Sequence, residues 1–324
     1  MVIYNKIKFS VFCTAISLLI FSSGLKAQDT NLSLTLNKKT ELNGHSFITN
    51  SIIEDPFVNT SFRLSAGVGS SSNYDVPLVI QGKEIKGVFG QLTYGAFDVS
   101  YRHKIKDWLA FSFGAKLRGQ LGSERISMIT EGIDIGTGFN FGWIFKVYES
   151  KKFMLSSSLA ISSQSVTIFN MSDFVEKIIE NGEITPDNKL VKTTNITAGM
   201  LGIRTAYAFS RTFGCIGKLN AGYGESISSK NKGYFDAGIS IDADLDPKLN
   251  VPIGFALGYD WNNFSTTDIN LTNPQNIIFQ INYTGRKDFD LGVEMNAQFF
   301  TLKRFDQDIN LEVLFVKAGI AYYF

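Results

Sequence analysis

The sequence predicts an all-β fold: a transmembrane antiparallel up-and-down β-barrel of about 12 strands, with a short helix in one extracellular loop. Three observations predict it. An export signal occupies the N-terminus, apolar residues then alternate with polar or small residues along one segment after another, and the connections between segments alternate between short and long. A soluble β-sandwich or β-helix would show the same alternation within each segment. The export signal, the connection lengths and the last strand are what favour the barrel.

Residues 1–27 are predicted to be a secretory signal peptide. Lys6 and Lys8 form a basic region, an apolar run follows from Phe9 to Phe21, and Ala27 is the expected residue before cleavage. A run of about 13 apolar residues is too short to cross a bilayer as a helix, which makes an N-terminal anchor the weaker alternative. The predicted domains are the signal peptide 1–27, a leader or plug segment 28–58 in the periplasm, and the barrel 59–324.

Composition narrows the function classes. The formal net charge is +1, so a nucleic-acid partner is not expected. The chain has 28 Phe, 12 Tyr and 29 Gly but only 6 Pro, which is typical of strands rich in aromatic residues that carry glycines within them. Cys215 is the single cysteine after the signal peptide, so no intrachain disulfide can form.

Period-two alternation marks the strands. In "IGFALGYDW", Phe255, Leu257 and Tyr259 share one face, while Gly254 and Ala256 belong to the other. Lipid offers backbone groups no hydrogen bonds, so a sheet with such an apolar outer face must close on itself. The expected strands are 60–70, 91–104, 108–120, 136–148, 153–168, 194–209, 212–224, 232–243, 250–262, 276–285, 289–301 and 310–324.

The opposite parity of these strands would line the lumen with charges of both signs. The candidate lumen-lining residues are Arg63, Asp98, Arg102, Lys116, Arg118, Lys146, Arg204, Lys218, Asp236, Asp242, Asp260, Arg286, Asp290, Glu294 and Lys317. Two interpretations follow. The lumen is either a narrow water-filled pore for small polar solutes or a non-conducting scaffold closed by salt bridges.

Two segments outside the predicted strands bear on access to the lumen. The apolar stretch "FITNSIIEDPFV" within 28–58 is long enough to enter the barrel as a plug; a disordered leader or an extra strand are the alternatives. In the longest loop, Ser172 begins and Gly182 ends an expected amphipathic helix. That helix would fold over the mouth, dock on a partner or pack on other loops.

Catalytic and metal chemistry have little support. Nucleophile or water activation needs a positioned base, but His103 lies on the lipid-facing parity at a short turn and His45 lies in the leader. An enzyme is therefore not expected. Asp242, Asp244 and Asp246 alternate along one face, yet the glycine and distal glutamate of a calcium loop are absent, so neither a metal nor another cofactor is expected.

The last strand resembles the C-terminal insertion signal of Gram-negative outer-membrane β-barrels. That family places a polar residue, a glycine two positions later, and aromatic or apolar residues at the third-last and last positions, which Lys317, Gly319, Tyr322 and Phe324 match. The resemblance covers about residues 60–324, and the cleavage region looks like that of Bacteroidota proteins. It implies an outer-membrane location, contact with lipid, insertion by the barrel-assembly machinery, and a porin or transport role or membership of a larger envelope complex.

Overall fold

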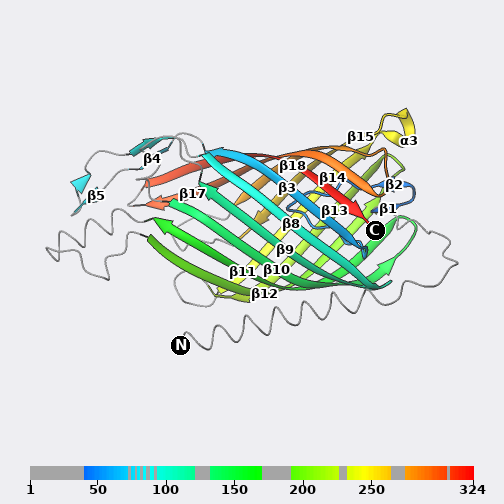
Figure 1. Ribbon diagram of the computed structural model, residues 1–324, viewed down its shortest axis with the longest axis horizontal. Coiled ribbons are helices and arrows are strands. Elements are labelled where there is room, and N and C mark those ends of the chain that lie inside the picture. Colours follow the sequence, from blue (N-terminus) through cyan, green and yellow to red (C-terminus); the bar gives the residue numbers. More distant parts are fainter. Residues whose placement is uncertain are drawn as a thin grey trace. The chain divides into compact units, whose positions relative to one another are not determined.

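A closed antiparallel barrel is the central feature of the computed structural model, which describes residues 40–71, 74–76, 79–80, 83–84, 88–90, 93–120, 132–169, 191–225, 232–263, 274–304 and 307–324 (Figure 1). Its strands are β3 (Ser61–Ser71), β8 (Thr93–Lys106), β9 (Leu109–Gln120), β10 (Gly132–Glu149), β11 (Phe153–Phe169), β12 (Val191–Ala208), β13 (Phe213–Gly224), β14 (Lys232–Asp244), β15 (Ile253–Asn262), β16 (Gln275–Tyr283), β17 (Phe289–Arg304) and β18 (Gln307–Tyr323). The predicted signal peptide and the predicted loop helix at 172–182 lie outside the described residues.

The barrel closes by pairing its last strand with its first. β18 pairs with β3 from Val313 opposite Ser71 to Tyr323 opposite Ser61, and every other strand pairs with its neighbours in chain order. Closure leaves no unpaired edge, which is the condition for a sheet to lie in lipid. The prediction of a twelve-stranded antiparallel barrel is confirmed, with strand bounds that differ from the expected ones by a few residues.

The two ends of the barrel differ in their connections. At one end, called here the short-turn end, α3 (Asp246–Leu249) links β14 to β15, and Asn250 ends this helix in the left-handed conformation with φ 53°. In Figure 1 this end also holds the C-terminus and the two small strands β1 and β2. The other end carries the longer connections, in one of which β4 (Tyr74–Val76) pairs with β7 (Val88–Gly90), and β5 (Val79–Ile80) with β6 (Lys83–Glu84). Among the described residues, no helix has the length and apolar character needed to cross a membrane.

Apolar side chains cover the outside of the barrel. Along β15 the exposed residues Phe255, Leu257 and Tyr259 alternate with the buried Ala256 and Asp260, and the same alternation runs along β16 and β17. Leu257 is 60% exposed, whereas Asp260 is 1% exposed. A soluble sheet would bury the first kind of residue and expose the second, so this parity fits a barrel wall in contact with lipid.

Placing a cation on the lipid face should therefore destabilise the barrel. Phe255→Arg is expected to cost about 2–4 kcal/mol of unfolding free energy, because the guanidinium would enter hydrocarbon at mid-strand. Ser112→Arg, which places the same group on the lumen side, should cost far less. Urea titration of the protein refolded into lipid vesicles measures both variants, and equal losses would contradict the assigned inside–outside parity.

Candidate functional site: the occupied lumen

Residues Thr40–Asn59, called here the lumen segment, lie inside the barrel near the short-turn end. The segment opens with a small hairpin in which β1 (Glu41–Leu42) pairs with β2 (His45–Ser46). The two residues between these strands, Asn43 and Gly44, have φ values of 54° and 78°. Asn-Gly is the pair that favours such tight two-residue turns, because both residues tolerate the left-handed conformation.

The apolar residues of the lumen segment pack on the inner wall. Phe47 and Ile53 are fully buried, and Phe57 is nearly so. They form one cluster with wall residues that point inward from β11, β12, β13 and β16. The wall members are Met154, Ala206, Ala208, Ile216 and Ile278. The barrel thus has an apolar core at this end, to which the lumen segment contributes the large side chains.

Glycines in the wall make room for these side chains. A Cβ atom on Gly214 would lie 2.5 Å from His45 Nε2 and 2.6 Å from Phe47 Cε1, and one on Gly254 would lie 2.4 Å from Ile48 Cδ1. All three distances are shorter than a Cβ contact allows. These two positions therefore need glycine because the lumen segment approaches the wall closely, a use of glycine that differs from turn formation.

A buried histidine–aspartate pair fastens the hairpin to β14. His45 Nε2 lies 2.8 Å from Asp242 Oδ2, and the two side chains are 0% and 1% exposed. The same carboxylate oxygen accepts the backbone N–H of Ile48 at 3.1 Å, while His45 Nδ1 lies 3.3 Å from the carbonyl oxygen of Arg211. Both side chains thus keep hydrogen-bond partners in the interior, although Oδ1 of Asp242 has none among the described residues.

Two arginines of the wall hold the acidic part of the lumen segment. Arg102 pairs with Asp55 at 2.6 Å and also donates to the carbonyl oxygen of Phe57 at 2.7 Å, and Arg204 pairs with Glu54. Burial alone would raise the pKa of the Asp55 carboxyl, but the Arg102 guanidinium outweighs burial and holds that pKa below its usual range. Arg204 does the same for the pKa of Glu54.

Acid should therefore loosen the lumen segment. Because the pKa values of Glu54 and Asp55 are lowered in the docked state, the two carboxylates stabilise docking fully at pH values above their ordinary pKa. This stabilisation is lost as the pH falls through the lowered pKa values. We expect the segment to stay docked from pH 7 down to about pH 4 and to release below it. Conductance in planar bilayers at pH 7, 5 and 3 measures release. In the Glu54→Gln/Asp55→Asn variant the segment should already be loose at pH 7, and a pH response equal to that of the native chain would contradict the assignment.

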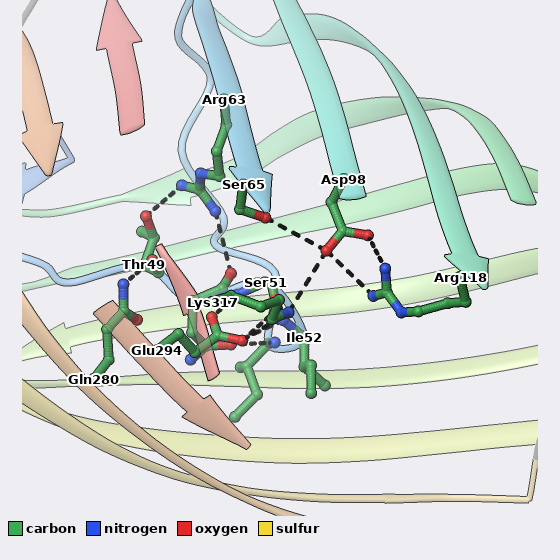
Figure 2. Close-up of polar contacts among 12 residues, drawn as sticks. Thr49, Ser51, Ile52, Arg63, Ser65, Asp98, Arg118, Gln280, Glu294 and Lys317 are labelled. Carbon is green, nitrogen blue, oxygen red and sulfur yellow. Dashed lines mark hydrogen bonds and ion pairs between the residues drawn. The ribbon is translucent and has the colours of Figure 1, made fainter. Parts of the chain in front are cut away.

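A second ion-pair network binds the middle of the lumen segment at Ser51. Figure 2 shows Ser51 between Glu294 of β17 and Lys317 of β18. Glu294 accepts the Ser51 N–H at 2.7 Å and pairs with Lys317 Nζ at 3.0 Å. Lys317 also lies 3.6 Å from Asp98, which pairs with Arg118 at 2.8 Å. Four of the predicted lumen residues thus form one chain of alternating charge.

Main-chain groups of the lumen segment are bound directly by the wall. Arg63 donates to the carbonyl oxygen of Asn50 at 3.1 Å and to the hydroxyl of Thr49, and Gln280 donates to the Thr49 carbonyl at 3.3 Å (Figure 2). On the other side of the barrel, Ser156 donates to the carbonyl of Pro56 at 2.6 Å. An irregular backbone needs such partners, because buried carbonyl groups are costly when unpaired.

Lys218 organises a separate cluster between β13 and β15. Its ammonium lies 2.8 Å from Asp236 and 2.8 Å from Asp260. Asn220 donates to Asp236 at 3.0 Å, and Asn276 donates to Asp260 at 3.1 Å. Three of the predicted lumen residues, Lys218, Asp236 and Asp260, come together here, on the side of the barrel away from β8 and β9.

The remaining predicted lumen residues separate into different environments. Lys146 pairs with Glu149 at 2.7 Å near the short-turn end, and Lys116 faces a cavity described below. Arg286 is a correction, since it belongs to the exposed turn between β16 and β17 and pairs with Asp288 at 2.6 Å instead of lining the lumen. β16 ends at Tyr283, two residues earlier than expected, so the period-two parity does not reach position 286.

The structure also describes the residues of the predicted insertion signal and the residues considered for catalysis or metal binding. Lys317 and Gly319 belong to the inward parity of β18, and Tyr322 and Phe324 are exposed outward, but their recognition by an assembly machine stays a prediction. His103 contacts the Tyr101 hydroxyl at 3.2 Å in an exposed position. Within the described ranges, no group of three or more His, Cys, Asp or Glu residues is arranged to hold a metal.

Sequence reasoning missed most of what the lumen segment contributes. Glu54, Asp55 and Ser51 were not selected because they precede the first strand and follow no period. The Asn43–Gly44 dipeptide was a usable signal for the hairpin. The pairing of His45 with Asp242 joins positions 197 residues apart, and a single sequence gives no signal for it.

Comparison with known proteins relates the chain to other barrels only in general architecture. No protein-family model and no curated protein matches the chain. Among solved structures, it is similar to an outer membrane channel from Pseudomonas putida F1 (11% identity, TM-score 0.46, 86% of this chain and 100% of that one) and to the translocator domain of the autotransporter NalP from Neisseria meningitidis (10%, 0.47, 83% and 90%). The KdgM porin in complex with oligogalacturonate is a further neighbour (7%, 0.41, 80% and 99%). At these values the substrates and roles of those proteins do not transfer to this chain.

Proposed function

We propose that this protein is an outer-membrane channel for small polar solutes, closed at its periplasmic, short-turn end by the lumen segment. The observation that carries the proposal is the way the segment is held. Side chains from β3, β8, β11–β12, β14 and β16–β18 bind it through ion pairs and hydrogen bonds, most of which water or a polar solute can replace.

The two faces of the wall support the rest of the proposal. The outer face is apolar at mid-strand positions such as Leu257 and Val293, which suits contact with outer-membrane lipid after insertion by the barrel-assembly machinery. The lumen instead presents carboxylates, amides, hydroxyls and cations, which suit polar solutes rather than hydrocarbons. The proposed channel function needs neither a catalytic base nor a cofactor nor nucleic acid.

The mode of transport differs from that of a permanently open pore. Because buried residues of the lumen segment occupy the short-turn end, solute can pass only after the segment shifts or leaves.

One observation favours a second candidate function, a permanently closed barrel that serves as a subunit of a larger envelope complex. The buried apolar cluster around Phe47 and Ile53 would resist displacement more than the polar contacts do.

Conductance in planar bilayers distinguishes the two functions. The full chain should show low or rare conductance, and a variant lacking residues 40–57 should show frequent, stable open steps, because the deletion empties the short-turn end of the lumen. The full-length Lys146→Met variant is the matched control, since Lys146 pairs with Glu149 away from the segment. Unheated electrophoresis checks that each barrel is folded. Silence from a folded deletion variant would reject the channel and favour the closed subunit.

A further inference from the structure

A cavity lies against the inner side of the lumen segment, between it and the wall formed by β3, β8, β9 and β10. Its volume is about 110 Å³. One bound water needs roughly 10–15 Å³ of such space, so the cavity holds several waters or a small polar molecule. A carboxylate or phosphate group fits such a space.

Lys116 is a cation of this cavity whose ammonium group contacts no acid among the described residues. It lies on β9, opposite Asp98 of β8 and Gly138 of β10, and it is exposed although its parity faces the lumen. Within the part of the chain that the structure describes, no hydrogen bond or ion pair engages its ammonium group. Gly138 adds no side chain beside it, so the lysine keeps its access to the space.

The acids around the cavity are already occupied. Glu54 pairs with Arg204, Asp55 pairs with Arg102, and Asp98 lies between Arg118 and Lys317. The cavity lining has four cationic and three acidic side chains, so that its net charge is +1. Arg63 donates to Asn50 and Thr49 of the lumen segment, so Lys116 is the lining cation whose charge is left available to an anion from outside.

Neutral hydrogen-bonding groups complete the surroundings of Lys116. Ser100, Ser112 and Asn140 line the same cavity and supply hydroxyl and amide donors. Asn140 approaches Gly114 so closely that a Cβ there would lie 2.4 Å from its Oδ1, which limits the positions that this amide can take. A cation flanked by neutral donors is an arrangement that recognises an oxyanion, since each oxygen can accept a hydrogen bond, and Asp98, which lies opposite Lys116 in the sheet, is already held by Arg118.

We infer that Lys116 and the donors around it form a binding subsite for the carboxylate or phosphate group of a small anionic solute. This inference rests on the proposed transport function, and it names the chemical class of the solute. The subsite lies against the inner side of the lumen segment, on the side away from the short-turn end. An anion bound there contacts the segment that must move before the solute can pass.

Binding to the full-length protein tests the subsite without requiring conduction. Isothermal titration in detergent uses inorganic phosphate and malonate as anionic probes and malonamide as the neutral counterpart of malonate. We expect both anions to bind, malonamide not to bind, and Lys116→Met to weaken the anions at least about tenfold, as the loss of a charge-assisted bond does. Lys116→Arg should retain binding, and the matched control Lys146→Met should leave it unchanged. A response to only one anion would identify which oxyanion the site accepts.

The outcomes separate the subsite from the channel. Three results would each overturn the subsite. The first is equal anion affinity of the native chain and Lys116→Met, and the second is an equal loss of affinity in Lys116→Met and Lys146→Met. The third is binding of malonamide as tight as that of malonate. In the variant lacking residues 40–57, Lys116→Met should also shift the reversal potential in a KCl gradient towards cation selectivity. If that deletion variant does not conduct while phosphate still binds through Lys116 in the full chain, the channel falls and the subsite stands.

Discussion

Lys317→Met is expected to lower the unfolding free energy of the barrel by about 3–5 kcal/mol, the typical cost of breaking a buried ion pair by removing one partner. The Lys317 side chain is 4% exposed, and its ammonium lies 3.0 Å from Glu294 and 3.6 Å from Asp98 and donates to Ser51. Its loss leaves the Glu294 carboxylate buried beside the lumen segment without a cation. Arg118 still pairs with Asp98, so the cost falls mainly on Glu294.

A double variant and a control make this prediction specific. Lys317→Met/Glu294→Gln removes both charges and should recover much of the loss, because the buried carboxylate is then gone. Lys146→Met breaks a pair whose acid is 47% exposed and should cost about 1 kcal/mol or less. Urea unfolding in lipid vesicles measures all three variants. A loss from Lys317→Met no larger than that from Lys146→Met would show that the Lys317 network does not stabilise the barrel.

Gly214→Val should displace the lumen segment. The new Cβ would lie 2.5 Å from His45 Nε2 and 2.6 Å from Phe47 Cε1, so one side must yield. β13 is hydrogen-bonded to strands on both sides, whereas the hairpin of the lumen segment pairs only with itself, so the hairpin is the part that moves. Overpacking of this kind costs roughly 1–3 kcal/mol, which is comparable to the contacts that hold the hairpin.

Chymotrypsin provides the measurement. Cleavage after Phe47 or Phe57 requires these buried side chains to leave the lumen, so we expect it to become at least about tenfold faster in Gly214→Val, which is what a shift of roughly 1.4 kcal/mol in the docking equilibrium produces. Gly199→Val is the matched control, because Gly199 lies on β12 with no atom within 4 Å of its added Cβ. Similar cleavage rates in the two variants would mean that the segment is not pressed against β13.

Much of the wall could be predicted from local pattern. The alternation of Phe255, Ala256 and Leu257 reports which side of the strand meets lipid, because side chains of a strand point to opposite faces in turn. The short connection between β8 and β9 predicts that the two strands pair in an antiparallel direction. The same alternation wrongly predicted that Arg286 lines the lumen, because β16 ends before this residue and the two-residue period no longer applies.

The candidate site was less predictable because it depends on pairs of residues far apart in the chain. The sequence indicated that Arg102, Arg204 and Lys116 face the lumen. The alternation of side chains along a strand does not indicate which of these cations forms an ion pair with a carboxylate. Two of them pair with the lumen segment, and the third is left facing a cavity. That difference depends on where Glu54 and Asp55 dock, which no local period encodes.

The sequence by itself determined the class of fold, the approximate strands and the face that each side chain takes, because these follow from the two-residue repeat of a strand and from the lack of hydrogen-bonding partners in lipid. Only the tertiary structure decided that Thr40–Asn59 occupies the lumen, with His45 against Asp242 and glycines where the wall must recede. The physical reason is that closing the barrel brings residues from opposite ends of the chain within bonding distance, and burial then favours the arrangement in which their polar groups bind one another.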